Sequence, residues 1–288
     1  MKIRTSIKNI ITLSLVFISV LTSYSYFAGN IQEKKQNPAG IYSEHRTIKE
    51  LKSIDDVIGV STNIVIGNVV SIEDYSDYTD QYIVSIEQNI KGTTNSANID
   101  VYETKGTLEV GSQYILFLES SESVLYPNTK YTSVYKESII KVENNNLFGD
   151  SKIVDKSLDI NQLVKNIEKS GKFSLKVNKQ YNIKTKYETV DEQIEDSDNT
   201  AIITASNIVK ANKYVSLVKL NPDEEFKGSI TSEDTILLPS NIQEGKKYIV
   251  FLKKGKGGIL EPSSREGSIV SEDQFDKYKE VKEKLKIK

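Results

Sequence analysis

The sequence contains no cysteine and no tryptophan, and it has one histidine, His45, and one methionine at its start. Without cysteine, a disulfide framework, a thiol nucleophile and cysteine-ligated zinc are all excluded. His45 lies between Glu44 and Arg46, ahead of the first expected helix, and a lone imidazole at such a place is typically hydrated rather than catalytic. We therefore predict a non-enzymatic protein with no catalytic residues, no metal site and no cofactor.

Arginine is almost as scarce as histidine. The 38 basic residues include only Arg4, Arg46 and Arg265, and with 40 acidic residues the formal net charge is −2. Proteins that bind nucleic acid concentrate positive charge on one face and use arginine to contact phosphates and guanines. A weakly acidic, arginine-poor chain is therefore not expected to bind nucleic acid.

The N-terminus has the layout of an export signal. Residues 1–9 carry basic side chains, residues 10–21 are uncharged and almost wholly apolar, and the small residues Ser23 and Ser25 precede Tyr26. This order predicts a signal peptide over residues 1–25, and residues 26–44 then form a tether. An uncleaved membrane anchor is the alternative, because an apolar helix of about 20 residues spans a bilayer. We expect a bacterial protein that is secreted or held at the cell surface.

Most of the remaining chain consists of two segments that share a set of motifs. Copy one contains GNVV at residues 67–70, the pair Lys91-Gly92, GSQYILFL at residues 111–118 and then Pro127; copy two contains SNIV at residues 206–209, Lys227-Gly228, GKKYIVFL at residues 245–252 and Pro262. Four markers in one order predict a duplicated module. We place the first module at residues 45–170, a linker at residues 171–187 and the second module at residues 188–288.

Each copy is predicted to begin and end with a helix. Thr47 with Glu50, and Thr189 with Glu192, have the spacing of a capping box. A closing helix is expected after Ser157 or Asp159 in copy one and after Ser271 in copy two. The last of these has an apolar stripe made of Phe275, Tyr278, Val281 and Leu285.

Between the helices the pattern predicts strands. The segments are short and rich in Ile, Val, Tyr and Thr; they are IVIGNVVSI, QYIVSIEQNI, NIDVYET and YILFL in copy one, and AIITASNIV, KYVSLVKL, DTILL and YIVFL in copy two. YILFL and YIVFL are apolar on both faces and are expected at the centre, with Tyr114, Phe117, Tyr248 and Phe251 in the core. Five or six antiparallel strands with helices in about 110 residues suit a small closed barrel.

These motifs resemble a known kind of module. The order of an apolar strand, K-G, G-x-x-Y-I-x-F-L, proline and helix is similar to the OB-like modules of exported bacterial proteins, and more distantly to the netrin-like domain of tissue inhibitors of metalloproteinases. The resemblance covers residues 54–169 and 188–286. It implies a mainly β fold with flanking helices, built from two tandem OB-like (netrin-like) antiparallel β-barrel modules. Netrin-like inhibitors use an N-terminal cysteine on the protease zinc, which this chain lacks, so any inhibition has to work by surface occlusion.

Two loops are candidate partner-binding sites. The loop EDYSDYTD belongs to copy one alone, and its candidate contact residues are Asp74, Tyr75, Asp77, Tyr78 and Asp80. Loops on a rigid scaffold commonly carry recognition. Calcium binding is disfavoured because the aspartates are three residues apart and no glycine or closing glutamate follows.

The second candidate loop is basic and follows YIVFL in copy two. Its lysines are Lys253, Lys254 and Lys256. It is either a flexible hairpin tip, which is the favoured interpretation, or an anion site. The lysine-rich last helix could lie on an anionic surface, but the favoured interpretation is that it covers one end of a barrel.

The sequence thus predicts a monomeric, exported, non-enzymatic protein that binds an extracellular protein or a cell-envelope component. It touches a membrane only through an uncleaved N-terminal segment. The alternative is an inhibitor or immunity-type factor that occludes a secreted protease or toxin. A hydrolase is least favoured, because no motif singles out one Ser-Lys or carboxylate pair.

Overall fold

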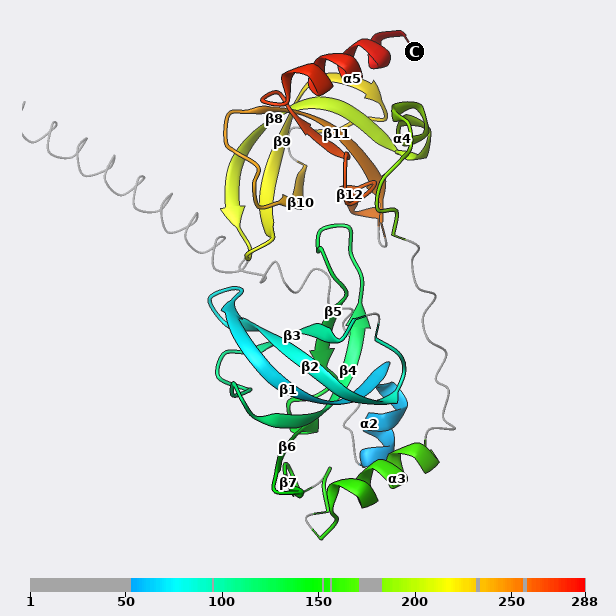
Figure 1. Ribbon diagram of the computed structural model, residues 1–288. Helices are drawn as coiled ribbons and strands as arrows, with labels where there is room; N and C mark the ends of the chain where they lie inside the picture. The colour runs from blue at the N-terminus through cyan, green and yellow to red at the C-terminus, as the bar shows by residue number, and fades with distance from the viewer. Residues whose placement is uncertain are drawn as a thin grey trace, which may run out of the picture. The chain divides into compact units, whose positions relative to one another are not determined.

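The structure is a computed structural model, and it describes residues 53–94, 96–151, 153–155, 157–170, 183–231, 234–255 and 258–287. The chain is mainly β, with one sheet in residues 53–170 (the first half) and another in residues 183–287 (the second half) (Figure 1). The expected signal peptide, the tether and the Thr47–Glu50 cap lie outside the described residues. None of the described helices is long and apolar enough to cross a membrane.

The first half contains a closed barrel. Its elements are α2 (Ile54–Val60), β1 (Asn63–Asp74), β2 (Thr79–Lys91), β3 (Asn98–Thr104), β4 (Gln113–Ser121), β5 (Lys130–Ser133), a 3-10 turn η2 (Lys136–Ser138), β6 (Ile139–Glu143), β7 (Asn146–Phe148) and α3 (Ile160–Ser170). The strand order is β1-β2-β3-β5-β4-β6-β7, and the additional pairing of β1 with β4 closes five strands into a ring.

The sequence predicted an antiparallel barrel, but one pair of strands in this barrel is parallel. β3 and β5 run parallel, with Asp100 beside Lys130 and Val101 beside Tyr131. The cause is geometric, because strand directions cannot alternate all the way around a closed ring with an odd number of strands. A five-stranded barrel therefore contains at least one parallel pair.

The second half has the same order of strands but does not close. It consists of α4 (Val190–Asp196), β8 (Asn199–Lys210), β9 (Val215–Lys227), β10 (Thr235–Pro239), β11 (Lys247–Lys254), β12 (Leu260–Pro262), β13 (Ile269–Ser271) and α5 (Phe275–Ile287). Its sheet runs β10-β9-β8-β11-β12, with β13 on β11. β10 and β12 approach without pairing, because β12 is only three residues long and ends in a proline, which lacks a backbone N–H.

The two halves make matching contacts at the K-G pair. The Lys91 ammonium donates to the carbonyl oxygen of Ile58 near the end of α2 (2.6 Å), and that of Lys227 donates to Ile194 in α4 (2.9 Å). The next glycines, Gly92 and Gly228, have φ of 72° and 67°. A Cβ on either would lie 2.5 Å from a backbone oxygen. The K-G pair therefore joins a helix end to a tight turn in each copy.

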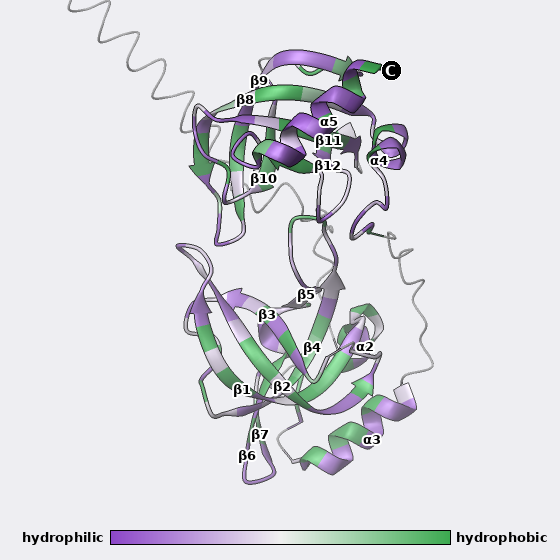
Figure 2. Ribbon diagram, turned by 45° about the horizontal axis from the view of Figure 1, so that its top comes forward, coloured by the Kyte–Doolittle hydropathy of each residue, from purple (hydrophilic) through white to green (hydrophobic). Residues whose placement is uncertain are grey.

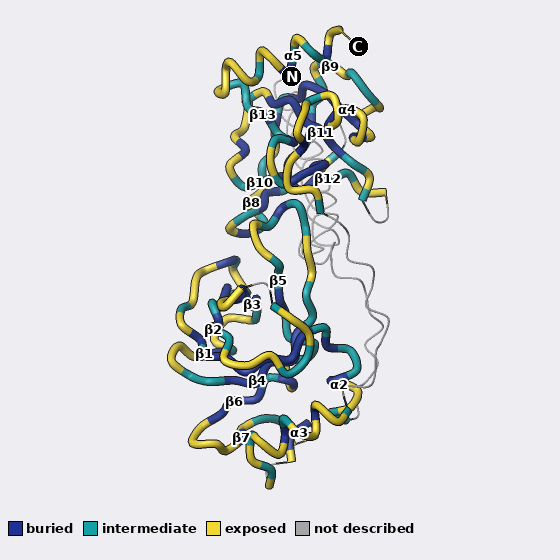
Figure 3. Tube along the Cα trace, turned by 45° about the vertical axis from the view of Figure 1, so that its right-hand side comes forward, coloured by how far each residue is buried: buried dark blue, intermediate teal, exposed yellow. Residues whose placement is uncertain are grey.

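The strands predicted to be central are central. β4 sends Ile115 and Phe117 to a core that includes α2 and α3, and it sends Leu116 and Leu118 to the barrel interior. Buried residues follow the strands, while exposed residues follow the loops and helix surfaces (Figure 3). The ribbon of α3 alternates between hydrophobic and hydrophilic bands, as an amphipathic helix does (Figure 2).

The observed helix caps and apolar stripes agree only in part with those predicted from the sequence. Thr189 caps α4 by accepting from the Glu192 amide, and Asp159 caps α3 through the Gln162 amide. In copy one the residue equivalent to Thr189 is Ser53, which accepts from the Asp56 amide. The predicted stripe of α5 is wrong at Phe275, which is 71% exposed. The helix begins only at that residue, so Phe275 lies in its first turn, while Val281 and Leu285 further along are buried.

Candidate functional site

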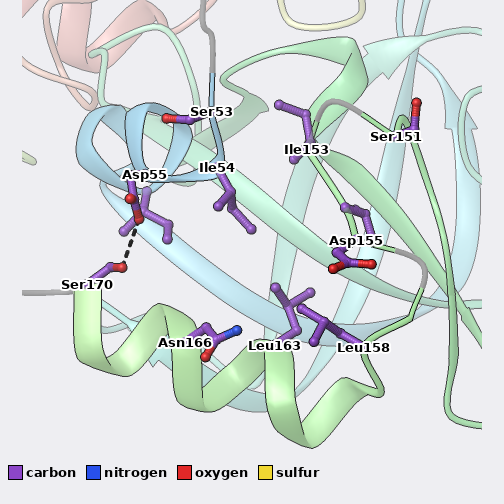
Figure 4. Close-up of a pocket in the computed structure, with 12 residues that line it drawn as sticks. Ser53, Ile54, Asp55, Ser151, Ile153, Asp155, Leu158, Leu163, Asn166 and Ser170 are labelled. Carbon is purple, nitrogen blue, oxygen red and sulfur yellow. Dashed lines mark hydrogen bonds between the residues drawn. The ribbon is translucent and has the colours of Figure 1, made fainter.

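A pocket of about 600 Å³ lies between α2, α3 and the segment that leads into α3 (Figure 4). We call it the helix pocket. Its lining residues come from α2 and its cap (Ser53, Ile54, Asp55, Ile58), from the lead-in segment (Ser151, Ile153, Val154, Asp155, Leu158) and from α3 (Leu163, Asn166, Ser170). Its volume is within the range of about 300–1,000 Å³ that is usual for small-molecule sites.

The floor of the helix pocket is apolar. Ile58, Ile153, Val154 and Leu163 are buried members of the core beneath it. Ile54 and Leu158 are only partly buried and pack against that core, and Figure 4 shows both directed toward the cavity. Apolar surface left open over a core is favourable to cover, at about 25 cal/mol per Å².

The rim of the helix pocket is polar. The Ser170 hydroxyl donates to Oδ1 of Asp55 (2.8 Å), which ties the end of α3 to the first turn of α2. On the opposite side, Oδ1 of Asp155 accepts from the backbone N–H (2.9 Å) and the hydroxyl (2.6 Å) of Ser157. These hydrogen bonds hold the pKa of the Asp155 carboxyl below its usual value, so this carboxylate is ionised at neutral pH.

Much of the helix pocket is lined by a segment that has no counterpart in the second half. β6 corresponds to β13, since Tyr114 pairs with Lys141 and its counterpart Tyr248 pairs with Ser271. After β13 the chain enters α5 through residues 272–274, whereas after β6 it forms β7 and then residues 149–159 before α3. Five lining residues come from this extra segment.

A second hollow, of about 560 Å³, adjoins α4 and is lined by Lys184, Tyr187, Glu192, Glu195 and Asp196. Two of its polar groups are already engaged. The Tyr187 hydroxyl donates to Asp196, and Lys253 forms an ion pair with the same carboxylate at 2.8 Å. Burial and the neighbouring Asp196 raise the pKa of Tyr187 to about 12. This hollow also offers less apolar surface than the helix pocket.

The candidate loop between β1 and β2 is mostly occupied by internal contacts. Asp74 forms an ion pair with Lys105, and Asp80 accepts from the Tyr82 hydroxyl (3.4 Å). Tyr75 is buried, whereas Asp77 and Tyr78 are exposed, Tyr78 at 77%. In the described parts of the chain, no group of three or more acidic or histidine side chains is placed to hold a metal ion.

Tyr75 belongs to a cluster of tyrosine rings around an ammonium. The Nζ of Lys130 lies 5.3 Å from the ring centroid of Tyr75, 5.0 Å from that of Tyr102 and 5.3 Å from that of Tyr126. The Tyr75 and Tyr126 hydroxyls are hydrogen-bonded at 2.9 Å. Burial lowers the pKa of the Lys130 ammonium and raises those of Tyr75 and Tyr102. We call these residues the tyrosine cluster.

The turn between β8 and β9 also contacts the tyrosine cluster. The Tyr214 ring lies 6.2 Å from Tyr75 and 6.0 Å from Tyr126, and its hydroxyl donates to Gln81 at 2.9 Å. Lys213 donates its backbone N–H to the Tyr75 carbonyl at 2.9 Å. Residues Lys213 and Tyr214 of the second half therefore engage the candidate loop at Tyr75.

The basic loop after β11 is partly neutralised. Lys253 is paired with Asp196, as described, and Lys254 is exposed and donates its backbone N–H to Asp198 at 2.7 Å. Lys256 lies outside the described residues. Among the predicted contact residues, Asp77, Tyr78 and the Lys254 side chain are thus left facing solvent.

Sequence reasoning missed the helix pocket altogether. One signal was present, because the chain between the last predicted strand and the closing helix is longer in copy one than in copy two. A comparison with known proteins finds neither a protein family nor a curated protein that matches this chain.

Proposed function

We propose that this chain is an exported, non-enzymatic binding protein that holds an extracellular or cell-envelope component in the helix pocket. The observation that carries the proposal is a cavity of about 600 Å³ with a partly uncovered apolar floor. Sites of this kind bind ligands through apolar contact and use a few polar groups for orientation. The leader sequence supports export.

We further propose that both halves are OB-like modules related by duplication. The ring order β1-β2-β3-β5-β4 is that of a small five-stranded barrel, and β10-β9-β8-β11-β12 repeats it without closure. The matched Lys91 and Lys227 contacts support a common origin. In such a pair, one copy can acquire a binding insertion while the other keeps the shorter connection.

Methyl NMR of the full chain without its leader tests the proposed function. With isoleucine methyl groups labelled and 1-octanol as an apolar probe, we expect shifts at Ile54 and Ile153 in the helix pocket. We expect none at Ile236 and Ile249, which are buried in the second half. Equal shifts at all four methyls, or none, would contradict a site in the helix pocket.

A pair of leucine variants sharpens this test. Leu158 and Leu260 are both partly buried leucines, but only Leu158 lines the helix pocket. Leu158→Asn should abolish the octanol-induced shifts at Ile54, whereas Leu260→Asn should leave them unchanged. The opposite pattern would place the octanol site elsewhere.

A further inference from the structure

The two halves contain the same hairpin with different tips. The strands β1 and β2 in the first half, and β8 and β9 in the second half, have 12 and 13 residues respectively. Four residues join the strands in each hairpin, residues 75–78 and residues 211–214. The sequence predicted a loop that belongs to copy one alone, and this is wrong, because the two turns have equal length. We call residues 73–78 the acidic tip and residues 209–214 the basic tip.

The two tips differ in charge. Three acidic residues of the acidic tip stand where the basic tip has an apolar residue and two lysines; the corresponding pairs are Glu73 and Val209, Asp74 and Lys210, and Asp77 and Lys213. The Lys213 ammonium forms an ion pair with Glu73, so the two tips meet through opposite charges. Complementary charge favours one pairing of surfaces over others. The tips therefore differ in the way that two mutually binding surfaces differ.

The basic tip also donates hydrogen bonds to the first half. The Asn212 side-chain amide donates to the Tyr126 hydroxyl at 3.3 Å. The Tyr214 hydroxyl donates to Gln81, whose side chain is buried and 3% exposed. Because a buried amide oxygen requires a donor, the Tyr214 hydroxyl satisfies a need of the first half. Together with Lys213, three consecutive residues of one turn bind the first half.

Apolar side chains from both halves cover one another beside the tips. Leu125, in the loop between β4 and β5, forms a buried cluster with Val215 and Leu237 of the second half. Leu125 is 7% exposed, and among the described residues it belongs to neither core cluster of the first half. Its burial therefore depends on the second half. Covering a leucine stabilises a contact more than an exposed ion pair does.

Arg265 makes a second and looser attachment. Its guanidinium donates to the carbonyl oxygens of Ser123 and Pro127, each at 3.4 Å, and forms an ion pair with Glu122 at 3.6 Å. Both hydrogen bonds are longer than about 3.0 Å, the usual length of N–H···O bonds. We therefore expect Arg265 to add less to the affinity between the halves than the tips do.

We infer that the acidic tip and the basic tip form a docking surface through which the two halves of one chain bind each other, with Tyr214 as the central contact. The partner of the acidic tip is then the second half of the same chain. A tyrosine suits a central position, because its ring buries apolar area while its hydroxyl donates a hydrogen bond. This inference is independent of the proposed function, since no tip residue lines the helix pocket.

Cutting the linker of the full chain, made without its leader, tests the inference. A site for a sequence-specific protease is inserted between residues 176 and 177, which lie outside the described residues, and the folded protein is cut. In size-exclusion chromatography at about 10 μM, we expect the cut halves to elute together, because a dissociation constant near 1 μM leaves most of such a pair bound. The uncut chain should elute as a monomer at the same concentration. Separate elution of the cut halves overturns the inference, and a dimer of the uncut chain shows that the tips join two copies instead.

Charge reversal at the tips tests their complementarity. Glu73 and Lys213 are both exposed, so reversing either charge leaves the cores intact. Glu73→Lys and Lys213→Glu should each weaken the association of the cut halves by about threefold to tenfold, and the double variant should restore it to within about twofold. A double variant that binds no better than the single variants overturns the pairing of the tips.

Tyr214→Ala tests the central contact. It should weaken the association of the cut halves by about tenfold or more, whereas Arg265→Ala should weaken it by about threefold or less. Tyr278→Ala is the matched control, because Tyr278 is also partly buried but packs on the core of the second half. If Tyr214→Ala weakens the association no more than Tyr278→Ala or Arg265→Ala, the central role of Tyr214 is overturned. Tyr214→Phe, which keeps the ring, should have a smaller effect than Tyr214→Ala, and an equal effect would contradict the role of the ring.

Discussion

The ammonium of Lys91 donates to the carbonyl oxygen of Ile58 at 2.6 Å, and this contact joins the end of β2 to the end of α2. Helices leave their last carbonyl groups without partners, and a cation there also complements the helix dipole. Lys227 repeats the contact in the second half. The first member of the K-G pair is therefore a helix cap supplied from a neighbouring strand.

Lys91→Met should destabilise the protein. It leaves the Ile58 carbonyl without its charged donor. The net cost is about 1–2 kcal/mol, because the variant no longer has to bury an ammonium group and this gain offsets part of the loss. Urea denaturation should show a lower midpoint. Lys105→Met is the control, because Lys105 pairs with Asp74 at the surface, where solvent screens the pair, so its urea midpoint should stay close to that of the parent protein. Equal midpoints for the two variants would contradict the capping role.

Gly92→Ala should cost more than Gly106→Ala, although the two glycines have nearly the same φ, 72° and 73°. Alanine in this left-handed conformation costs about 1–2 kcal/mol at either position. Only at Gly92 would the new Cβ meet a backbone atom, the Thr62 oxygen at 2.5 Å, which adds about 1–3 kcal/mol. Thermal or urea unfolding of the two variants measures the difference, and equal losses would show that the turn can relax.

Phe117→Ala and Phe251→Ala should each cost about 3–5 kcal/mol, because both rings are fully buried on central strands and their removal leaves a cavity. Phe275→Ala is the matched control, since that ring is mostly exposed and its loss should cost under about 0.5 kcal/mol. If Phe275→Ala melted as low as Phe117→Ala, the placement of α5 would be wrong.

The tyrosine cluster should make stability fall at alkaline pH. Burial raises the pKa of Tyr75 and of Tyr102 in the folded protein, so these phenols keep their protons when the unfolded chain loses them above about pH 10. The unfolded state then binds fewer protons, and the free energy of unfolding decreases as pH rises through that range. Replacing both tyrosines with phenylalanine should flatten this decrease, measured by urea midpoints between about pH 9 and pH 11. An unchanged slope would mean that these hydroxyls ionise freely in the folded protein.

Local patterns predicted the elements well. The segment NIDVYET coincides with β3, and the doubly apolar YILFL and YIVFL lie at the centres of their sheets, because strand burial follows from side-chain alternation. The K-G pair recurs in both halves of the sequence, yet its role depends on the distant Ile58 carbonyl, which no local pattern reveals. The parallel pairing of β3 with β5 likewise follows from ring closure and not from either strand.

The candidate site was harder to foresee. Tyr75 was expected in an open loop, but it packs against Tyr102 with ring centroids 4.7 Å apart, a contact between separate strand ends. The helix pocket needs three segments to converge, and residues 149–159 have neither helical nor strand periodicity. Its polar rim residues, such as Asp155, look like ordinary loop residues until α2 and α3 are placed beside them.

The central claim, that the helix pocket takes up an apolar ligand, is tested most directly by fluorescence, because the chain has no native tryptophan. Asn166 lines the pocket and Asn161 does not, and both are exposed residues of α3. Titrated with 1-octanol, Asn166→Trp should show a saturable blue shift of its emission, and Asn161→Trp should show none. Identical responses from the two tryptophans, or no response from Asn166→Trp, would contradict the account.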